Sequence, residues 1–139
     1  MRYSALRVEN VTKKQASWKM KVRLYYCGMR SINLLTDMTN YIMLELGQPM
    51  HAFDNRKVSS VQVKTIKEDS EFTTLDGQVR KLEKGTLMIH NDKEPVAIAG
   101  VMGGLASEIV DDTTSLFLES ATFDAVAIRK TASKLDLRT

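Results

Sequence analysis

The first third of the chain carries apolar residues at helical spacing. Residues 18–27 and 32–46 each place apolar side chains on one face of a helix. Gly28 and Gly47 stand where the two helices would end, and Gly47 suits the left-handed conformation of a C-terminal cap. Residues 3–8 alternate well enough for a short strand. We therefore predict a strand followed by two helices.

The segment after the second helix is predicted as a loop. Pro49 cannot continue a helix, and it biases Gln48 toward extended backbone. His51 follows two residues later. We interpret residues 48–54 as a turn that exposes His51 just beyond the end of a helix.

From Val58 onward the apolar pattern has a period of two, which is typical of strands. Residues 61–65 place two valines and a threonine on one face and polar side chains on the other, which predicts a half-buried strand. Residues 72–82 hold two short runs around Asp76-Gly77, a dipeptide that supplies the positive φ angles of a tight hairpin turn. Residues 86–99 predict a second hairpin around a polar turn.

The last third predicts a core strand and a third helix. Residues 115–118 form an apolar run that ends at Glu119, and Asp124 suits the N-cap of a helix through Lys134. The whole pattern predicts an α+β fold, with mostly antiparallel β-sheet structure bracketed by helices at both ends. It indicates a single domain over residues 1–139.

Composition limits the class of protein without fixing its function. With 139 residues, 43% of them hydrophobic, the chain can bury a core without disulfides. Its one cysteine, Cys27, lies on an apolar helical stripe, where we expect a small core residue. No apolar run approaches the roughly 20 residues that span a bilayer, and the start lacks a signal-peptide core, so we expect a cytoplasmic protein with no membrane partner. The net charge of +3 permits an RNA partner but does not demand one.

Glu119 is the most informative candidate residue, because an acid directly after an apolar run is expected to be buried and to need a partner. One interpretation is structural: the carboxylate caps backbone amides or pairs with an arginine such as Arg129. On the residues alone we weight this above the second interpretation, which is recognition of a ligand hydroxyl.

The glycine-rich segment at residues 100–104 offers close backbone approach and positive φ at three positions, which suits a wall against a small ligand. A tight turn is the plainer alternative. The segment matches neither a dinucleotide-binding fingerprint nor a P-loop, so an ATP site is not expected here.

His51 could polarise a carbonyl or orient water, although a lone loop histidine usually does neither. No second histidine or cysteine stands at metal-ligand spacing, so no metal site is predicted. Basic residues gather near both ends of the chain and could contact a nucleic-acid backbone, but solvated helix faces explain them equally simply, and no aromatic falls in an RNA-stacking motif. These residues are Lys13, Lys14, Lys19, Lys21, Arg23, Arg129, Lys130, Lys134 and Arg138.

Three segments together carry a resemblance to a known family. They are DMTNY at residues 37–41 running into LELGQPMHAFD at 44–54, AGVMGG at 99–104, and LESA at 118–121 with Phe123. In their order and spacing the chain resembles the editing module of the bacterial-type phenylalanyl-tRNA synthetase β subunit. The likeness extends in weaker form over the whole chain.

The resemblance implies a proofreading hydrolase. Modules of this family hydrolyse tyrosine wrongly esterified to the phenylalanine tRNA, because a pocket built for phenylalanine rejects an added hydroxyl by only about a hundredfold. The implied partners are the acceptor end of tRNA(Phe), the tyrosine moiety, and a synthetase α subunit in an α2β2 assembly. The domain itself needs no cofactor, whereas ATP and magnesium serve amino-acid activation on the α subunit of the whole enzyme.

The resemblance also implies the roles of individual residues. Glu119 falls where the family recognises the tyrosine hydroxyl, and Thr139 falls near the scissile ester. His51 and Thr139 are the catalytic candidates, in a mechanism that positions water and needs no serine or cysteine nucleophile. The remaining candidates are expected to line the amino-acid pocket together with His51: Thr39, Asn40, Pro49, Ala99, Gly100, Gly103 and Ser120.

Two departures from the family pattern bear on this interpretation. The stretch before Trp18 lacks the proline that the family often carries, and the chain stops at Thr139, so we expect a module excised from a larger subunit. The main alternative is a non-catalytic structural or RNA-binding module of the synthetase. A free-standing esterase that clears misacylated tRNA in trans is a third, disfavoured reading.

Overall fold

The computed structural model describes residues 1–12 and 15–137, which form three helices, one 3-10 turn and nine strands. In chain order these elements are β1 (Arg2–Val8), α1 (Trp18–Tyr26), α2 (Leu34–Leu46), β2 (Met50–Asp54), β3 (Gln62–Thr65), β4 (Ser70–Thr73), β5 (Val79–Leu82), β6 (Leu87–His90), β7 (Pro95–Ile98), β8 (Met102–Gly103), η1 (Leu105–Ser107), β9 (Leu116–Thr122) and α3 (Ala125–Lys134).

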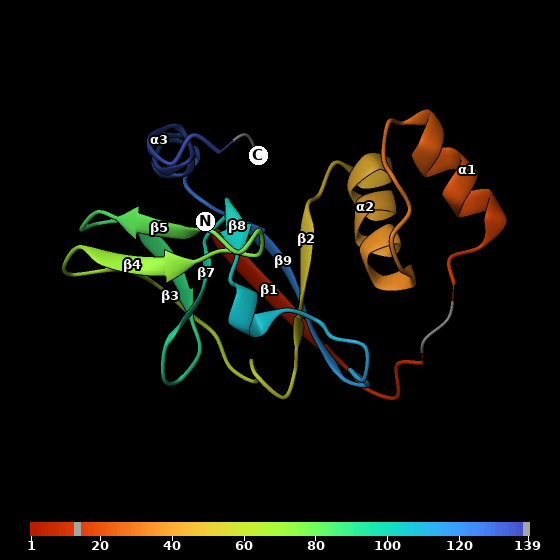
Figure 1. Ribbon diagram of the computed structural model, residues 1–139, viewed down its shortest axis with the longest axis horizontal. Coiled ribbons are helices and arrows are strands. Elements are labelled where there is room, and N and C mark those ends of the chain that lie inside the picture. The colour runs from red at the N-terminus through yellow and green to blue at the C-terminus, as the bar shows by residue number, and fades with distance from the viewer. Residues whose placement is uncertain (13–14, 138–139) are drawn as a thin grey trace.

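Strand β9 forms the centre of a three-stranded antiparallel sheet, in the order β1-β9-β2. This sheet stands between helices α1 and α2 on one side and the remaining strands on the other (Figure 1). Its register places both Ala5 of β1 and His51 of β2 opposite Glu119 of β9. The first and last parts of the chain are thus joined in one sheet.

A second sheet has the order β3-β6-β7-β8, and β4 and β5 form a separate hairpin. The bridge between Thr74 and Gly104 ties this hairpin to the chain beside β8. One hydrophobic core cluster joins the two larger sheets: Phe53, Val58, Ile89, Val96, Ala97 and Ala99 are buried in it, and Phe117 and Phe123 pack against it. Odd-numbered side chains of β2 and β9 therefore face the second sheet.

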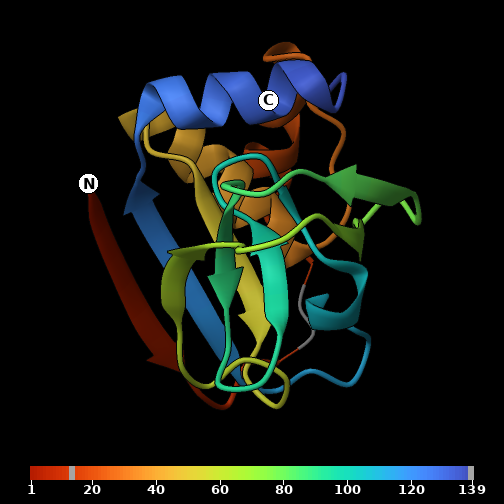
Figure 2. The same cartoon turned by 90° about the vertical axis from the view of Figure 1, so that its left-hand side faces the viewer.

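The helices flank the strands at both ends of the molecule. Helix α2 packs against β2, and α1 packs against α2 (Figure 1). Helix α3 runs across one end of the strands (Figure 2), where Ile128 packs on the core cluster. Asn33 and Asp124 cap α2 and α3 by accepting hydrogen bonds from the backbone N–H groups of Thr36 and Ala127.

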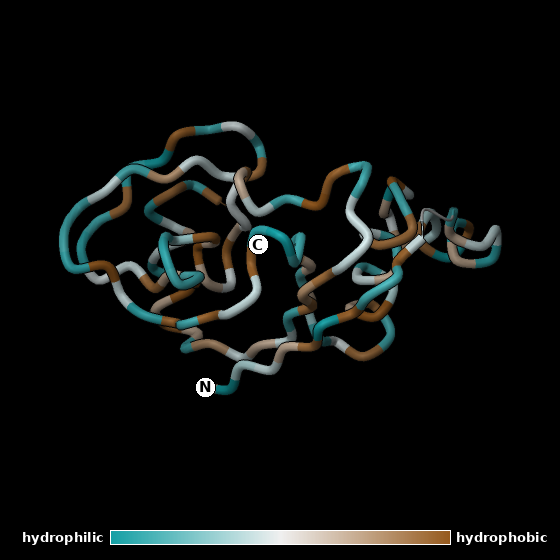
Figure 3. Tube along the Cα trace, turned by 90° about the horizontal axis from the view of Figure 1, so that it is seen from below, coloured by the Kyte–Doolittle hydropathy of each residue, from teal (hydrophilic) through white to brown (hydrophobic). Residues whose placement is uncertain are grey.

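Short hydrophobic and hydrophilic stretches alternate along the trace (Figure 3). Within residues 1–12 and 15–137, no helix has the length and apolar character needed to cross a bilayer.

The fold confirms the predicted α+β class with helices at both ends. Both hairpins form, as do the strand before α1 and the two N-terminal helices. Gly47 has the left-handed conformation expected of a C-terminal cap, with φ 69°, and Asp124 is the predicted N-cap.

Four local predictions about strands and turns were wrong. Residues 50–54 are strand β2 rather than loop, because they pair with β9. Strand β3 is exposed along its whole length rather than half-buried, since it lies at the edge of its sheet. In the first hairpin only Gly77 takes a positive φ, and in the glycine-rich segment only Gly100 does.

Two predictions about single residues also need correction. Cys27 is exposed rather than part of the core, because Leu24 is the only residue of α1 that is fully buried. Glu119 lies within strand β9 and not at its end, since the strand continues to Thr122.

Candidate functional site

The register of β2 and β9 brings His51 and Glu119 together. The two residues are cross-strand partners, so their side chains project from the same face of the sheet. That face is turned toward the second sheet, as the burial of Phe53 two residues beyond His51 shows. A candidate acid and a candidate imidazole thus meet on a rigid sheet rather than on a loop.

Glu119 is a buried carboxylate held by a tyrosine. Only 7% of the residue is exposed, and the Tyr3 hydroxyl donates a 2.8 Å hydrogen bond to its Oε2 atom. Burial raises the pKa of Glu119 to about 7, an effect that the hydrogen bond from Tyr3 partly opposes. The partner shown is therefore Tyr3, and not Arg129 as one interpretation of the sequence had it.

His51 is a neutral histidine at neutral pH. Burial lowers the pKa of its imidazole to about 4. The ring meets Phe53 edge-on, with centroids 4.5 Å apart. Its Nε2 atom is buried and has no hydrogen-bond partner among the described residues. An imidazole in this state can donate or accept one hydrogen bond without a change of charge.

Gly103 of β8 forms the wall against which the His51 ring lies. A Cβ atom at this position would stand 2.9 Å from both Cε1 and Nε2 of His51, and equally close to Leu75 of the adjoining hairpin. Any side chain here would have to displace the imidazole. The predicted wall against a ligand is thus, in this structure, a wall against His51.

Two more candidates lie around the core rather than beside Glu119. Ala99 is fully buried in the core cluster. Gly100 has φ +65°, and a Cβ there would stand 3.0 Å from Phe123 and 3.1 Å from Ile128 of α3. A glycine is therefore required at position 100, both by the backbone conformation and by the close approach of α3.

The other predicted pocket residues do not meet Glu119 in this structure. Ser120 points to the opposite face of the sheet, the side on which α2 packs, because successive strand residues alternate. Thr39 and Asn40 are half-buried on α2, and Pro49 is exposed before β2. Thr139 lies outside the described residues.

Tyr3 and Leu75 are site residues that the sequence did not indicate. Tyr3 lies 116 positions from Glu119, and only the pairing of β1 with β9 brings them together. A tyrosine in a predicted strand carries no sign of its partner. Leu75 reaches the site because its backbone N–H donates to the Gly103 carbonyl, a contact between a hairpin turn and β8.

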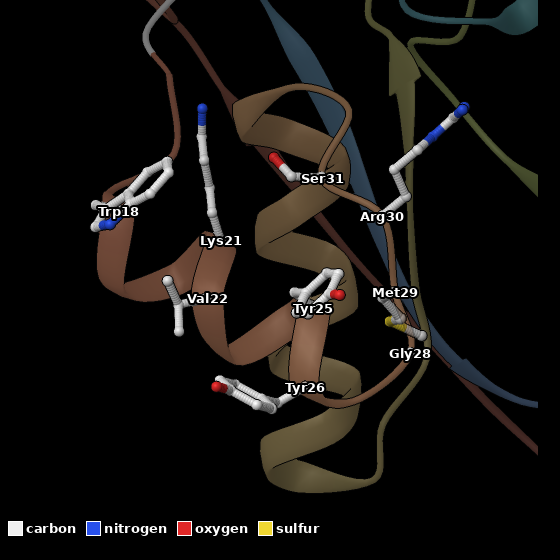
Figure 4. Close-up of a pocket in the computed structure, with 9 residues that line it drawn as sticks. All are labelled: Trp18, Lys21, Val22, Tyr25, Tyr26, Gly28, Met29, Arg30 and Ser31. Carbon is white, nitrogen blue, oxygen red and sulfur yellow. The ribbon is translucent and has the colours of Figure 1, made fainter.

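Two grooves lie away from this site. The larger has a volume of about 690 Å³ and runs along α1 and the following loop (Figure 4). The second, of about 330 Å³, is lined by Val11, Thr12 and Gln15, by the start of α2 and the residues just before it, and by residues of the 109–113 segment. Neither is lined by a predicted site residue. The part of the chain that the structure describes also holds no group of three or more His, Cys, Asp or Glu side chains suited to a metal ion.

Comparison with known proteins identifies the family. Residues 1–139 match the family model described as the B3/4 domain, and the chain belongs to this family.

Three relatives are more specific than the family model, because all are β subunits of one enzyme. The chain is 44% identical over 138 residues to the phenylalanine–tRNA ligase β subunit of Staphylococcus saprophyticus, with 98% of the chain and 17% of that subunit covered. It is 45% identical over 139 residues to the β subunit of Desulfotalea psychrophila, with 98% and 17% covered, and 42% identical to that of Aquifex aeolicus, with 99% and 18% covered. The chain therefore spans about a sixth of the length of these relatives. The resemblance to phenylalanyl-tRNA synthetase β subunits is confirmed.

A solved structure shares the fold. The crystal structure of an N-terminal fragment of the phenylalanyl-tRNA synthetase β subunit from Pyrococcus horikoshii superimposes with a TM-score of 0.59 at 9% identity. The match covers 97% of this chain and 45% of that one. At this identity the likeness concerns the fold alone.

Proposed function

We propose that this chain hydrolyses the ester of tyrosine on the tRNA for phenylalanine. Its relatives are β subunits of phenylalanine–tRNA ligase, and a ligase that admits phenylalanine needs a second site to remove tyrosine. The observation that carries the proposal is the cross-strand pair of Glu119 and His51, both desolvated, with Gly103 against the His51 ring.

Glu119 selects the substrate through its burial. A tyrosine hydroxyl donates a hydrogen bond to the carboxylate, whereas phenylalanine covers the same carboxylate and offers it nothing. Leaving a buried acceptor unsatisfied costs about 1–3 kcal/mol, more for a charged group. Selection between the two amino acids therefore amounts to about 5- to 150-fold.

His51 serves the hydrolytic step by orienting water. Water attacks the ester carbonyl carbon, the bond between that carbon and the ribose oxygen breaks, and the ribose oxygen takes up the proton that the water loses and becomes a hydroxyl. The neutral imidazole can orient the attacking water through one hydrogen bond at Nε2, without taking up its proton. Roles in substrate binding for Thr39, Asn40, Pro49 and Ser120, and a role near the ester for Thr139, rest on the resemblance to the family alone, since the four described residues do not meet Glu119 in this structure.

The proposed setting is a larger enzyme. In it the chain acts as part of a β subunit in an α2β2 assembly, receives the acceptor end of tRNA(Phe), and leaves ATP- and magnesium-dependent activation to the α subunit. The hydrolytic step itself uses the chain's own residues and water, with no cofactor.

The proposal is tested by deacylation of Tyr-tRNA(Phe), by this chain and by an assembled ligase that carries it in the β subunit. The parent should hydrolyse the ester, while Glu119→Gln and His51→Ala should each slow the reaction at least tenfold. Glu71→Gln, which changes an exposed carboxylate on β4, is the matched control and should leave the rate unchanged. Full activity in both site variants would contradict the assignment.

A second candidate function, binding of unpaired bases in RNA, is favoured by the groove along α1. Trp18, Tyr25 and Tyr26 line this groove and are 79%, 75% and 83% exposed, and Lys21 lies among them (Figure 4). Residues 10–36 contain six lysines and arginines and no acid, whereas the rest of the chain has fourteen basic and seventeen acidic residues. Exposed aromatics beside cations are the usual platform for single-stranded nucleic acid.

Trp18 provides the test of this second function, because it is the chain's one tryptophan and so the source of its indole fluorescence. A single-stranded oligoribonucleotide should quench this fluorescence, in a manner that weakens with salt, and the duplex of the same sequence should not. Tyr26→Ala should weaken binding, and Val79→Ala, at an exposed position on β5, should not. Equal affinity for the strand and the duplex would contradict base stacking.

A further inference from the structure

The carboxylate of Glu119, which is proposed to select the substrate, already accepts a hydrogen bond from a phenol. That phenol is the side chain of Tyr3. Tyr3 lies on β1, where its cross-strand partner is Ala121, two residues beyond Glu119 on the same face of β9. Diagonal neighbours of this kind lie within reach of an aromatic side chain. The Tyr3 hydroxyl uses that reach to donate its 2.8 Å hydrogen bond to Oε2 of Glu119.

The packing around Tyr3 keeps this bond in place. Its ring meets Phe123 at a centroid distance of 6.3 Å and packs against the core cluster. Burial, the charge of Glu119 and the hydrogen bond to it all raise the pKa of the Tyr3 phenol above its ordinary value. The phenol therefore stays protonated and remains a donor throughout the neutral range.

We propose that Tyr3 is a positioning residue for substrate selection: it occupies Oε2 of Glu119 and presents Oε1 to the hydroxyl of the substrate tyrosine. This inference rests on the proposed function. A carboxylate has two oxygens and accepts several hydrogen bonds, so one phenol on each oxygen satisfies it. The hydroxyl of the substrate then donates the second hydrogen bond to Glu119, beside the one that Tyr3 already donates.

Tyr3 has a second effect, which is on the charge of Glu119. Hydrogen bonds from a donor favour the ionised carboxylate, and this one opposes the effect of burial. Without it, Glu119 would hold its proton to higher pH. A protonated Glu119 facing phenylalanine leaves no unpaired charge, so the selection against phenylalanine would weaken.

The groups facing Glu119 allow this effect to be isolated. Tyr3 on β1 and His51 on β2 are the titratable groups that the register places beside it. His51 loses its proton at a pH of about 4, and Tyr3 stays protonated in the neutral range. A change in selectivity between about pH 6 and pH 9 therefore reports the proton of Glu119.

Tyr3→Phe tests the proposal, because it removes one hydroxyl and keeps the packed ring. Deacylation of Tyr-tRNA(Phe) and of Phe-tRNA(Phe) is measured across that pH range for the parent, for Tyr3→Phe and for Thr65→Val, a control that also removes one hydroxyl, at an exposed position of β3. Tyr3→Phe should lose selectivity for tyrosine at neutral pH and regain it about one to two pH units higher than the parent. The control should follow the parent.

Two results would overturn the proposal. One is an unchanged pH profile in Tyr3→Phe. The other is faster hydrolysis of the tyrosyl ester at an unchanged midpoint, since Tyr3 would then compete with the substrate instead of preparing its site.

A readout that does not depend on hydrolysis separates this inference from the proposed function. Carbon-13 NMR of glutamate-labelled protein follows the Glu119 carboxyl directly, and its titration should move upward by the same one to two units in Tyr3→Phe. A parent that fails to hydrolyse either ester contradicts the proposed function alone. An unmoved Glu119 titration contradicts the role of Tyr3 alone.

Discussion

Glu119 and His51 should make opposite contributions to the pH dependence of folding. Burial raises the pKa of Glu119 from 4.5 to about 7 and lowers that of His51 from 6.5 to about 4. A shift of one pKa unit corresponds to about 1.4 kcal/mol, so each residue accounts for about 3 kcal/mol between its protonation states. The fold therefore favours the neutral form of Glu119 and the neutral form of His51.

The signs follow from where each proton is bound more tightly. The folded chain binds the Glu119 proton more tightly, so this contribution to stability is complete below pH 4.5 and is lost as the pH rises to about 7. It binds the His51 proton more weakly, so that contribution is complete above pH 6.5 and is lost as the pH falls to about 4. In the shared window the unfolded chain carries the proton on His51 and the folded chain carries it on Glu119, so the two slopes cancel.

Replacing one residue of the pair leaves the other's contribution to the pH dependence of the free energy of unfolding uncancelled. In urea denaturation, Glu119→Gln should raise the free energy of unfolding by about 3 kcal/mol over the parent at about pH 8 and by little at about pH 4. His51→Gln should show the reverse dependence, added to a constant loss of packing. Glu71→Gln, at an exposed strand position, should change stability by less than about 0.5 kcal/mol at either pH.

A pH-independent effect of Glu119→Gln would contradict the pKa shift of this residue. It would mean that the ionised carboxylate is not penalised in the folded chain. The desolvation on which selection of the tyrosine hydroxyl depends would then be absent.

Two further predictions concern Gly103, which lies against His51, and Asp54, at the end of the same strand. Gly103→Ala should displace the His51 ring, because the added Cβ would stand 2.9 Å from it. The rate of ester hydrolysis should fall at least tenfold and the His51 NMR signals should change; unchanged signals would show that the sheets move apart instead. Asp54→Ala removes the fully buried carboxylate that Arg56 binds at the end of β2, and should lower the free energy of unfolding in urea by about 3 kcal/mol at neutral pH. Glu9→Ala, which breaks an exposed ion pair, should lower it by less than about 1 kcal/mol. Equal losses would contradict an anchoring role for Asp54.

The sequence predicted the elements whose signals are local. Helical spacing followed by Gly47 located α2, and Asp124 located the start of α3, because capping depends on residues three positions apart. The second hairpin was predicted for the same reason, since its two strands and turn are adjacent in the chain.

The errors arise where distant segments meet. Residues 50–54 were predicted as a loop because Pro49 interrupts the helix, yet pairing with β9 makes them a strand. Cys27 was predicted in the core because its helix has an apolar stripe, and a stripe does not reveal whether another element covers it.

The candidate site was predicted in its residue types and not in its arrangement. Glu119 was expected to be buried and to need a partner, and both expectations hold. That the partner is Tyr3, and that His51 stands opposite, depends on strand register between the two ends of the chain. No local pattern shows which strands pair across such a separation, although apolar alternation helps to set the register once they do.

Selection of tyrosine by a buried Glu119 is measured by the ratio of kcat/KM for Tyr-tRNA(Phe) over Phe-tRNA(Phe), in the parent and in Glu119→Ala. The ratio should be about 5 to 150 in the parent and should fall toward one in the variant, because the buried acceptor is gone. A ratio that stays the same in Glu119→Ala, or a parent that does not distinguish the two esters, would contradict selection by Glu119.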